Sequence, residues 1–62
     1  MDKELLSLMT LDCIDLRNIK ERINIMRSRH GGYYFQLSEI IRIIDILLEG
    51  YEKIIDGEIK NE

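Results

Sequence analysis

The most informative segment of this 62-residue sequence is residues 37–56, which read LSEIIRIIDILLEGYEKIID. When successive residues are placed about 100° apart, as on an α-helix, the large apolar side chains fall in one arc of about 160°. These side chains are Leu37, Ile40, Ile41, Ile43, Ile44, Leu47, Leu48, Tyr51, Ile54 and Ile55. A β-strand would alternate apolar and polar residues, and adjacent pairs such as Ile40 and Ile41 break that alternation. We therefore predict a helix over residues 34–56, with Gly57 in the position that ends it.

A second amphipathic pattern lies in the first half of the chain and predicts a helix over residues 12–29. Its apolar seam is formed by Leu16, Ile19, Ile23 and Met26, at the 3-4-3 spacing of a helix face. Asp12 falls in the middle of this stripe when the stripe is extended toward the N-terminus. Because Asp and Thr are favoured at helix N-caps, we expect Asp12 or Thr10 to cap the helix and residues 1–11 to form a separate segment, such as a short helix. The alternative is one long helix with a buried carboxylate at Asp12.

A turn is predicted between the two helices, at residues 30–33, which read His-Gly-Gly-Tyr. Adjacent glycines supply the positive φ that ends a helix and reverses the chain. A short connection between two amphipathic helices makes them antiparallel neighbours. The predicted fold is all-α: residues 1–62 form one antiparallel two-helix hairpin, with residues 57–62 as a C-terminal tail.

The second helix is too apolar for a hairpin that stands alone. An arc of about 160° is wider than the stripe of a little over 100° that one neighbouring helix covers. Small scaffolds also need a disulfide, a metal or a partner subunit for stability, and Cys13 is the only cysteine. We therefore expect a homodimer that forms a four-helix bundle. The residues expected at the self-association surface are Ile40, Ile43, Ile44, Leu47, Tyr51 and Ile54. The alternative is that residues 1–11 fold back over the excess apolar surface.

Composition argues against most catalytic classes. Cys13 and His30 are the only thiol and the only imidazole, and the sequence has no phosphate-binding glycine motif and no metal-ligand spacing. We therefore expect no metal and no cofactor, and an enzyme is the less favoured class. No signal peptide or membrane span is expected, which predicts a cytoplasmic protein. Residue types with AT-rich codons abound, which favours a bacterial or phage origin.

The polar face of the second helix is the predicted binding surface. Ile46 stands there alone among charged side chains, as an apolar anchor at a protein interface would. The expected partner-binding residues are Glu39, Arg42, Asp45, Ile46 and Glu49. We predict a small regulatory protein that binds, and thereby inhibits, a larger protein. A second alternative is an acidic mimic or modulator of nucleic acid, but the net charge of −3 and the basic residues of helix one favour ion pairing across the hairpin.

Two short segments resemble the sporulation-regulator aspartyl-phosphate phosphatases of Gram-positive spore formers. They are Ile19-Lys20-Glu21-Arg22 with Met26, and Asp45-Ile46-Leu47-Leu48-Glu49-Gly50-Tyr51, within a resemblance over residues 14–55. The resemblance implies a two-helix hairpin that acts on the phosphorylated aspartate of a response regulator. Of the family's Ser-Gln-Glu-Leu-Asp signature only Asp45 is present, since these positions read Ile41-Arg42-Ile43-Ile44-Asp45. Under this alternative, Asp45 is the catalytic residue and Arg42 contacts the partner.

Overall fold

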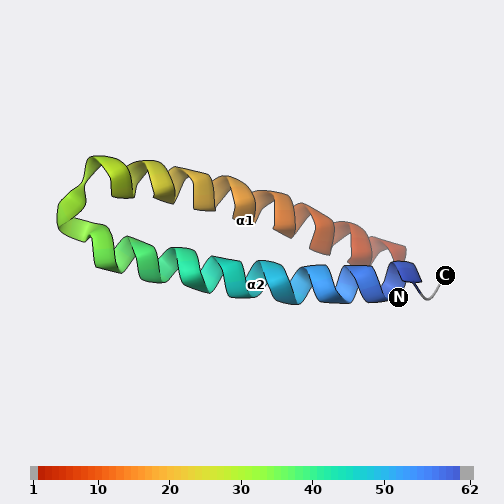
Figure 1. The fold of residues 1–62 in the computed structure, drawn as a ribbon. Helices are drawn as coiled ribbons and strands as arrows, with labels where there is room; N and C mark the ends of the chain where they lie inside the picture. Colours follow the sequence, from red (N-terminus) through yellow and green to blue (C-terminus); the bar gives the residue numbers. More distant parts are fainter. Residues whose placement is uncertain (1, 61–62) are drawn as a thin grey trace.

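The protein is a hairpin of two long helices (Figure 1). The computed structural model describes residues 2–60. Helix α1 spans Lys3–Arg29, a short 3₁₀ turn η1 spans Gly31–Tyr33, and α2 spans Tyr34–Lys60. The helices run antiparallel along a body of 47 × 15 × 12 Å, with the turn at one end and both chain ends at the other. The predicted all-α antiparallel hairpin is confirmed. We call the end that carries η1 the tip and the opposite end the open end.

Helix α1 is continuous, so the expected break at Asp12 and the separate segment 1–11 are wrong. The helix is capped ten residues earlier, where the Asp2 carboxylate accepts a hydrogen bond from the backbone N–H of Glu4 at 3.0 Å. Asp12 is exposed at the edge of the apolar stripe, so the buried carboxylate of the alternative is not found either. Its carboxylate accepts a hydrogen bond from the Tyr51 hydroxyl at 2.8 Å. This partner on α2 makes an acidic residue acceptable at the edge of the apolar stripe.

The turn lies where it was predicted, but its backbone differs from the expectation. The His30 N–H donates to the Met26 carbonyl at 2.8 Å, and the Tyr33 N–H donates to the His30 carbonyl at 3.1 Å. No residue in the described part of the chain has a positive φ, so Gly31 and Gly32 do not use the left-handed region. The reversal is achieved by His30, at φ −128° and ψ 74°, followed by one 3₁₀ turn.

Helix α2 continues four residues beyond its predicted end at residue 56. Gly57 keeps a helical φ and does not act as the terminating residue, because the helix runs on to Lys60. A cation in the last turn interacts favourably with the helix dipole. The expected tail is therefore helical through Lys60, and its last two residues lie outside the described part of the chain.

The core is a thin apolar layer between the helices. Its buried residues are Met9, Cys13 and Ile23 from α1 and Ile41, Ile44 and Leu48 from α2. Partly buried apolar residues extend the layer: Leu16, Leu37, Tyr51 and Ile55. Cys13, at 3% exposure, fills this layer as a small apolar side chain. No polar or charged residue of the described chain is buried, so the core itself holds no titratable carboxylate or cation.

Candidate protein-interaction surfaces

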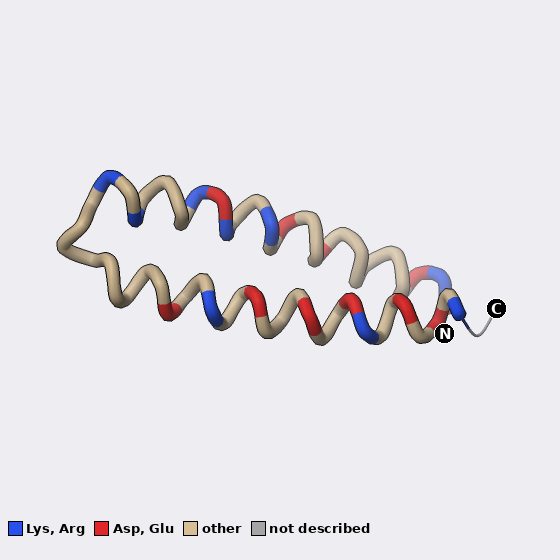
Figure 2. The backbone as a smooth tube through the Cα atoms, in the orientation of Figure 1, with Lys and Arg blue, Asp and Glu red and all other residues tan. Residues whose placement is uncertain are grey.

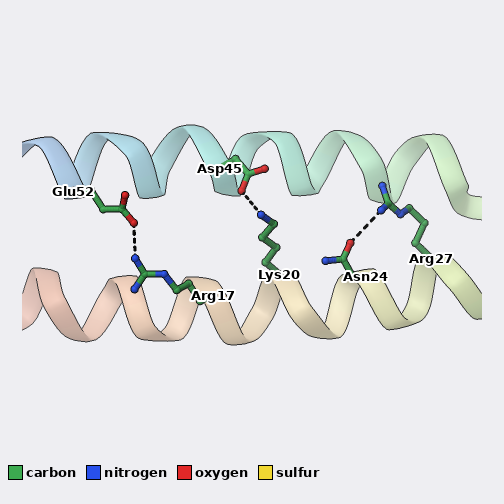
Figure 3. A network of polar contacts seen from close by, with 6 residues as sticks. All are labelled: Arg17, Lys20, Asn24, Arg27, Asp45 and Glu52. Carbon is green, nitrogen blue, oxygen red and sulfur yellow. Dashed lines mark hydrogen bonds and ion pairs between the residues drawn. The ribbon is translucent and has the colours of Figure 1, made fainter.

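One face of the hairpin is held together by polar contacts between the helices (Figure 3). Figure 3 draws the contacts of Arg17 with Glu52 and of Lys20 with Asp45, the latter at 2.6 Å, and a third contact joins Arg27 to Ser38 at 2.9 Å. We call this surface the ion-pair face. Three bases of α1 thus meet polar and acidic side chains of α2, as expected from the uneven charge of the two helices (Figure 2). Each exposed pair adds roughly 0.2–1 kcal/mol, so the contacts orient the helices more than they stabilise them.

The opposite face of the hairpin is apolar. Residues two apart on a helix point about 200° apart, so Ile19 lies opposite Arg17 on α1 and Leu47 lies opposite Asp45 on α2. A shallow cleft on this side is lined by both helices, by Asp12, Asp15, Leu16, Leu47 and Tyr51. The residues of the apolar face are Leu8, Ile19 and Met26 from α1 and Ile40, Ile43, Leu47 and Ile54 from α2. Each of them exposes 37–52% of its surface.

The wide apolar arc of α2 is therefore only half covered. Ile44, at 6% exposure, packs against α1, whereas the neighbouring Ile43 remains 47% exposed. Helix α1 covers one edge of the arc, and the four α2 residues of the apolar face form the other edge. The alternative in which residues 1–11 fold back over this edge is not seen, because residues 3–11 continue α1 alongside the C-terminal half of α2 (Figure 1).

Four of the six residues predicted for self-association lie at this surface: Ile40, Ile43, Leu47 and Ile54, at 43–48% exposure. Tyr51 is half-buried at the edge of the cleft, where its hydroxyl is bound by Asp12. This hydrogen bond raises the pKa of the Tyr51 hydroxyl, because ionised Asp12 stabilises the protonated phenol. Ile44 belongs to the core of the hairpin and is not available to a second chain. The spacing of α2 could not separate Ile44 from Ile43, because both lie inside the same arc.

Of the residues predicted to bind a partner, Asp45 lies on the ion-pair face, and the others lie on the outer surface of α2. Their charges are neutralised within the hairpin, in pairs that join Glu39 to Arg42, Asp45 to Lys20 and Glu49 to Lys53. The hydrogen bond from Arg42 lowers the pKa of the Glu39 carboxyl, and the same contact raises the pKa of Arg42. Ile46 is 55% exposed among these pairs. Three and four residues away on the helix, Ile46 is bordered by Arg42 and Glu49 on one side and by Ile43 and Gly50 on the other.

The tip carries a group of exposed aromatic rings at residues 33–35. Phe35 is 83% exposed, and its ring meets that of Tyr34 edge to face at 5.7 Å. The Arg27 guanidinium lies 5.2 Å from the centre of the Tyr34 ring, within the range of a cation–π contact. The signal was present in the sequence as three consecutive aromatic residues, 33–35, directly after the glycines.

The residues considered for chemistry do not gather at one place. Cys13 is buried in the core, while His30 lies at the tip, and no group of three or more His, Cys, Asp or Glu within residues 2–60 is arranged to hold a metal. Asp45, the residue implied by the phosphatase resemblance, is half exposed and paired with Lys20. Its catalytic role stays a prediction. Neither helix of the described chain has an apolar stretch fit to cross a membrane.

Comparison of the chain with family models, with curated proteins and with solved structures gave no match.

Proposed function

We propose that this protein is a self-associating helical module that binds and thereby inhibits a larger protein. In this proposal two hairpins pack through their apolar faces into a four-helix bundle. The outer surface of α2, centred on Ile46, is left for the partner protein. The observation that supports the proposal is the row of half-exposed residues Ile40, Ile43, Leu47 and Ile54 beside Ile19 and Met26.

The apolar face supports self-association on energetic grounds. Complete burial of an Ile or Leu side chain contributes roughly 1.5–3 kcal/mol, so covering the exposed half of each one contributes roughly 1 kcal/mol. A row of exposed apolar side chains such as that along α2 is typical of an interaction site. Helices pack face to face in this way in four-helix bundles, where the shared core lies between the two pairs.

The outer surface of α2 supports a heterologous contact. The charges around Ile46 are already paired, so they form a polar rim whose desolvation costs less than that of free charges. An apolar anchor bordered by such a rim matches the usual anatomy of protein interfaces. The partner we expect is a folded protein that offers a small apolar pocket rimmed by polar groups.

The test uses two neighbouring residues whose side chains are about equally exposed, at 48% for Leu47 and 55% for Ile46. We expect Leu47→Asp to shift the mass in sedimentation equilibrium from dimer to monomer. Ile46→Asp is the matched control in that measurement and is expected to remain dimeric. In a pull-down from a bacterial lysate, Ile46→Asp is expected to lose the partner that the wild type retains. A monomeric wild type would refute the self-association, and undiminished recovery by Ile46→Asp would refute the partner surface.

A further inference from the structure

We infer that the second copy docks in the antiparallel sense, with the two tips at opposite ends of the bundle and the two α2 helices facing each other at Leu47. This inference rests on the proposed self-association and adds the geometry of the interface. It is derived from the spacing of the apolar face, from the distribution of charge along the hairpin, and from two charged residues of α1 that have no partner within the described chain.

The first observation is the symmetry of the exposed row on α2. Ile40, Leu47 and Ile54 follow one another at intervals of seven residues, so all three lie on one side of the helix. A two-fold axis that passes near Leu47 pairs residues at equal distances on either side of it. Leu47 then meets its own copy, and Ile40 of each chain meets Ile54 of the other. Every exposed apolar residue of this row finds an apolar counterpart.

The second observation is that the two halves of the hairpin carry opposite charge (Figure 2). The tip half, residues 18–47, has five Lys and Arg residues against three Asp and Glu residues, a net charge of +2. The open half, residues 2–17 and 48–60, has four bases against eight acids, a net charge of −4. Antiparallel docking places each basic tip beside an acidic open end. Docking with both tips at one end would place like charges together, which is unfavourable across distances within a Debye length of about 8 Å.

The third observation concerns Asp15 and Arg22, which flank Ile19 on α1. These three residues line one shallow hollow on the surface of that helix. Neither Asp15 nor Arg22 forms an ion pair within the described part of the chain, although four other pairs form there. The contacts from Arg17 to Glu52 and from Lys20 to Asp45 place Ile19 at about the level of Leu47 along the hairpin. The same two-fold axis therefore passes near Ile19 and brings Arg22 of each chain opposite Asp15 of the other.

The geometry is tested by disulfide trapping with one cysteine introduced at a time into the full chain, which keeps its buried Cys13. Antiparallel docking predicts that Leu47→Cys forms a cross-linked dimer on mild oxidation. Ile40→Cys alone is expected to form none, because fourteen residues of helix hold its two copies about 21 Å apart. A mixture of Ile40→Cys and Ile54→Cys is expected to cross-link, because a disulfide needs Cα atoms within about 7 Å. The wild type is the control, since its own thiol, Cys13, is buried.

A second measurement is independent of cysteine chemistry. Asp15→Arg and Arg22→Asp are each expected to weaken dimerisation by about tenfold, because each replaces two attractive contacts with two repulsive ones. The double variant, with both charges reversed, is expected to recover the wild-type dissociation constant in sedimentation equilibrium. Both residues are exposed, so neither change disturbs the core.

The outcomes separate the geometry from the proposed function. Two results in a protein that is dimeric by mass would overturn the antiparallel arrangement alone. One is a cross-link between two copies of Ile40→Cys. The other is a Leu47→Cys variant that cross-links only when it is mixed with Ile19→Cys. Failure of the double charge reversal to restore dimerisation would also overturn it. A wild type that sediments as a monomer at all concentrations would overturn the self-association and this inference together.

Discussion

A comparison of Ile44→Ala with Ile43→Ala tests whether α1 covers one edge of the apolar arc of α2 and leaves the other edge open. The two residues are adjacent and chemically identical, so their helix propensities and their denatured states change equally. They differ in exposure, at 6% for Ile44 and 47% for Ile43. Any difference in stability between the two variants therefore reports packing against α1.

The magnitude follows from the neighbours of Ile44. Its side chain packs in the buried cluster with Cys13, Ile23, Ile41 and Leu48. Truncation of a buried Ile to Ala costs about 2–5 kcal/mol, and the lower part of this range applies because two helices in a hairpin can close partly over the space. For Ile43, only about half of the side chain is covered, so we expect a loss of roughly 1 kcal/mol or less in the isolated hairpin. A single core of this size supplies only about 3–5 kcal/mol in total, so Ile44→Ala removes most of it.

The assay is thermal unfolding followed by far-ultraviolet circular dichroism, at several protein concentrations. A loss of 1 kcal/mol shifts the midpoint of a small domain by roughly 4–8 °C, so Ile44→Ala is expected to lower it by at least about 8 °C. This shift is expected to persist at every concentration. The shift caused by Ile43→Ala is expected to be small at low concentration and to grow as the protein associates, because Ile43 is buried only by a second copy.

Two results would refute this reasoning. Equal shifts for the two variants at the lowest concentration would mean that α1 covers both edges of the arc. A shift for Ile43→Ala that is independent of concentration would mean that no second chain packs on that edge. Urea unfolding at the same concentrations is the control for thermal aggregation, and the order of the two variants must be the same in both experiments.

Three further predictions concern single contacts. Asp2→Ala removes the cap on the Glu4 N–H and is expected to lower the free energy of unfolding by about 1 kcal/mol, measured by urea unfolding. Tyr51→Phe is expected to abolish a loss of stability at high pH. The hydrogen bond to Asp12 raises the pKa of Tyr51, so its contribution to folding stability is complete below the ordinary tyrosine pKa of about 10. This contribution is lost as the pH rises through the raised pKa, and thermal midpoints measured against pH will show the loss. Gly57→Ala is expected to stabilise the hairpin by about 0.5–1 kcal/mol in thermal unfolding, because Gly57 is helical and open space surrounds an added Cβ.

Each of these predictions has its own control. Asp2→Asn keeps a capping oxygen and must lose less stability than Asp2→Ala. Tyr33→Phe removes a hydroxyl for which no hydrogen bond is found in the described structure, so the loss of stability at high pH must be the same as in the wild type. An unchanged loss of stability at high pH in Tyr51→Phe would contradict the role of Asp12. A destabilised Gly57→Ala would contradict the helical backbone at that residue.

The helical character of the second half of the chain, the place of the turn and the antiparallel order of the helices were determined by the sequence alone. A helix repeats every 3.6 residues, so the spacing of Ile and Leu in residues 37–56 identifies a helix without reference to any other segment. The glycines at residues 31–32 likewise mark the turn, and a short turn between two amphipathic helices requires them to be antiparallel. The angular width of the apolar arc, about 160°, also indicates that one neighbouring helix leaves part of it uncovered.

The tertiary structure decided everything that depends on how the two helices are rotated about their axes. Ile43 and Ile44 are equivalent in the sequence pattern, and only the packing against α1 places Ile44 in the core and Ile43 at the surface. Helix α1 runs through Asp12 without a break, and the Asp12 carboxylate accepts a hydrogen bond from the hydroxyl of Tyr51, 39 residues away. Spacing along one helix carries no information about such contacts, because the rotation of each helix is set by the side chains of the other.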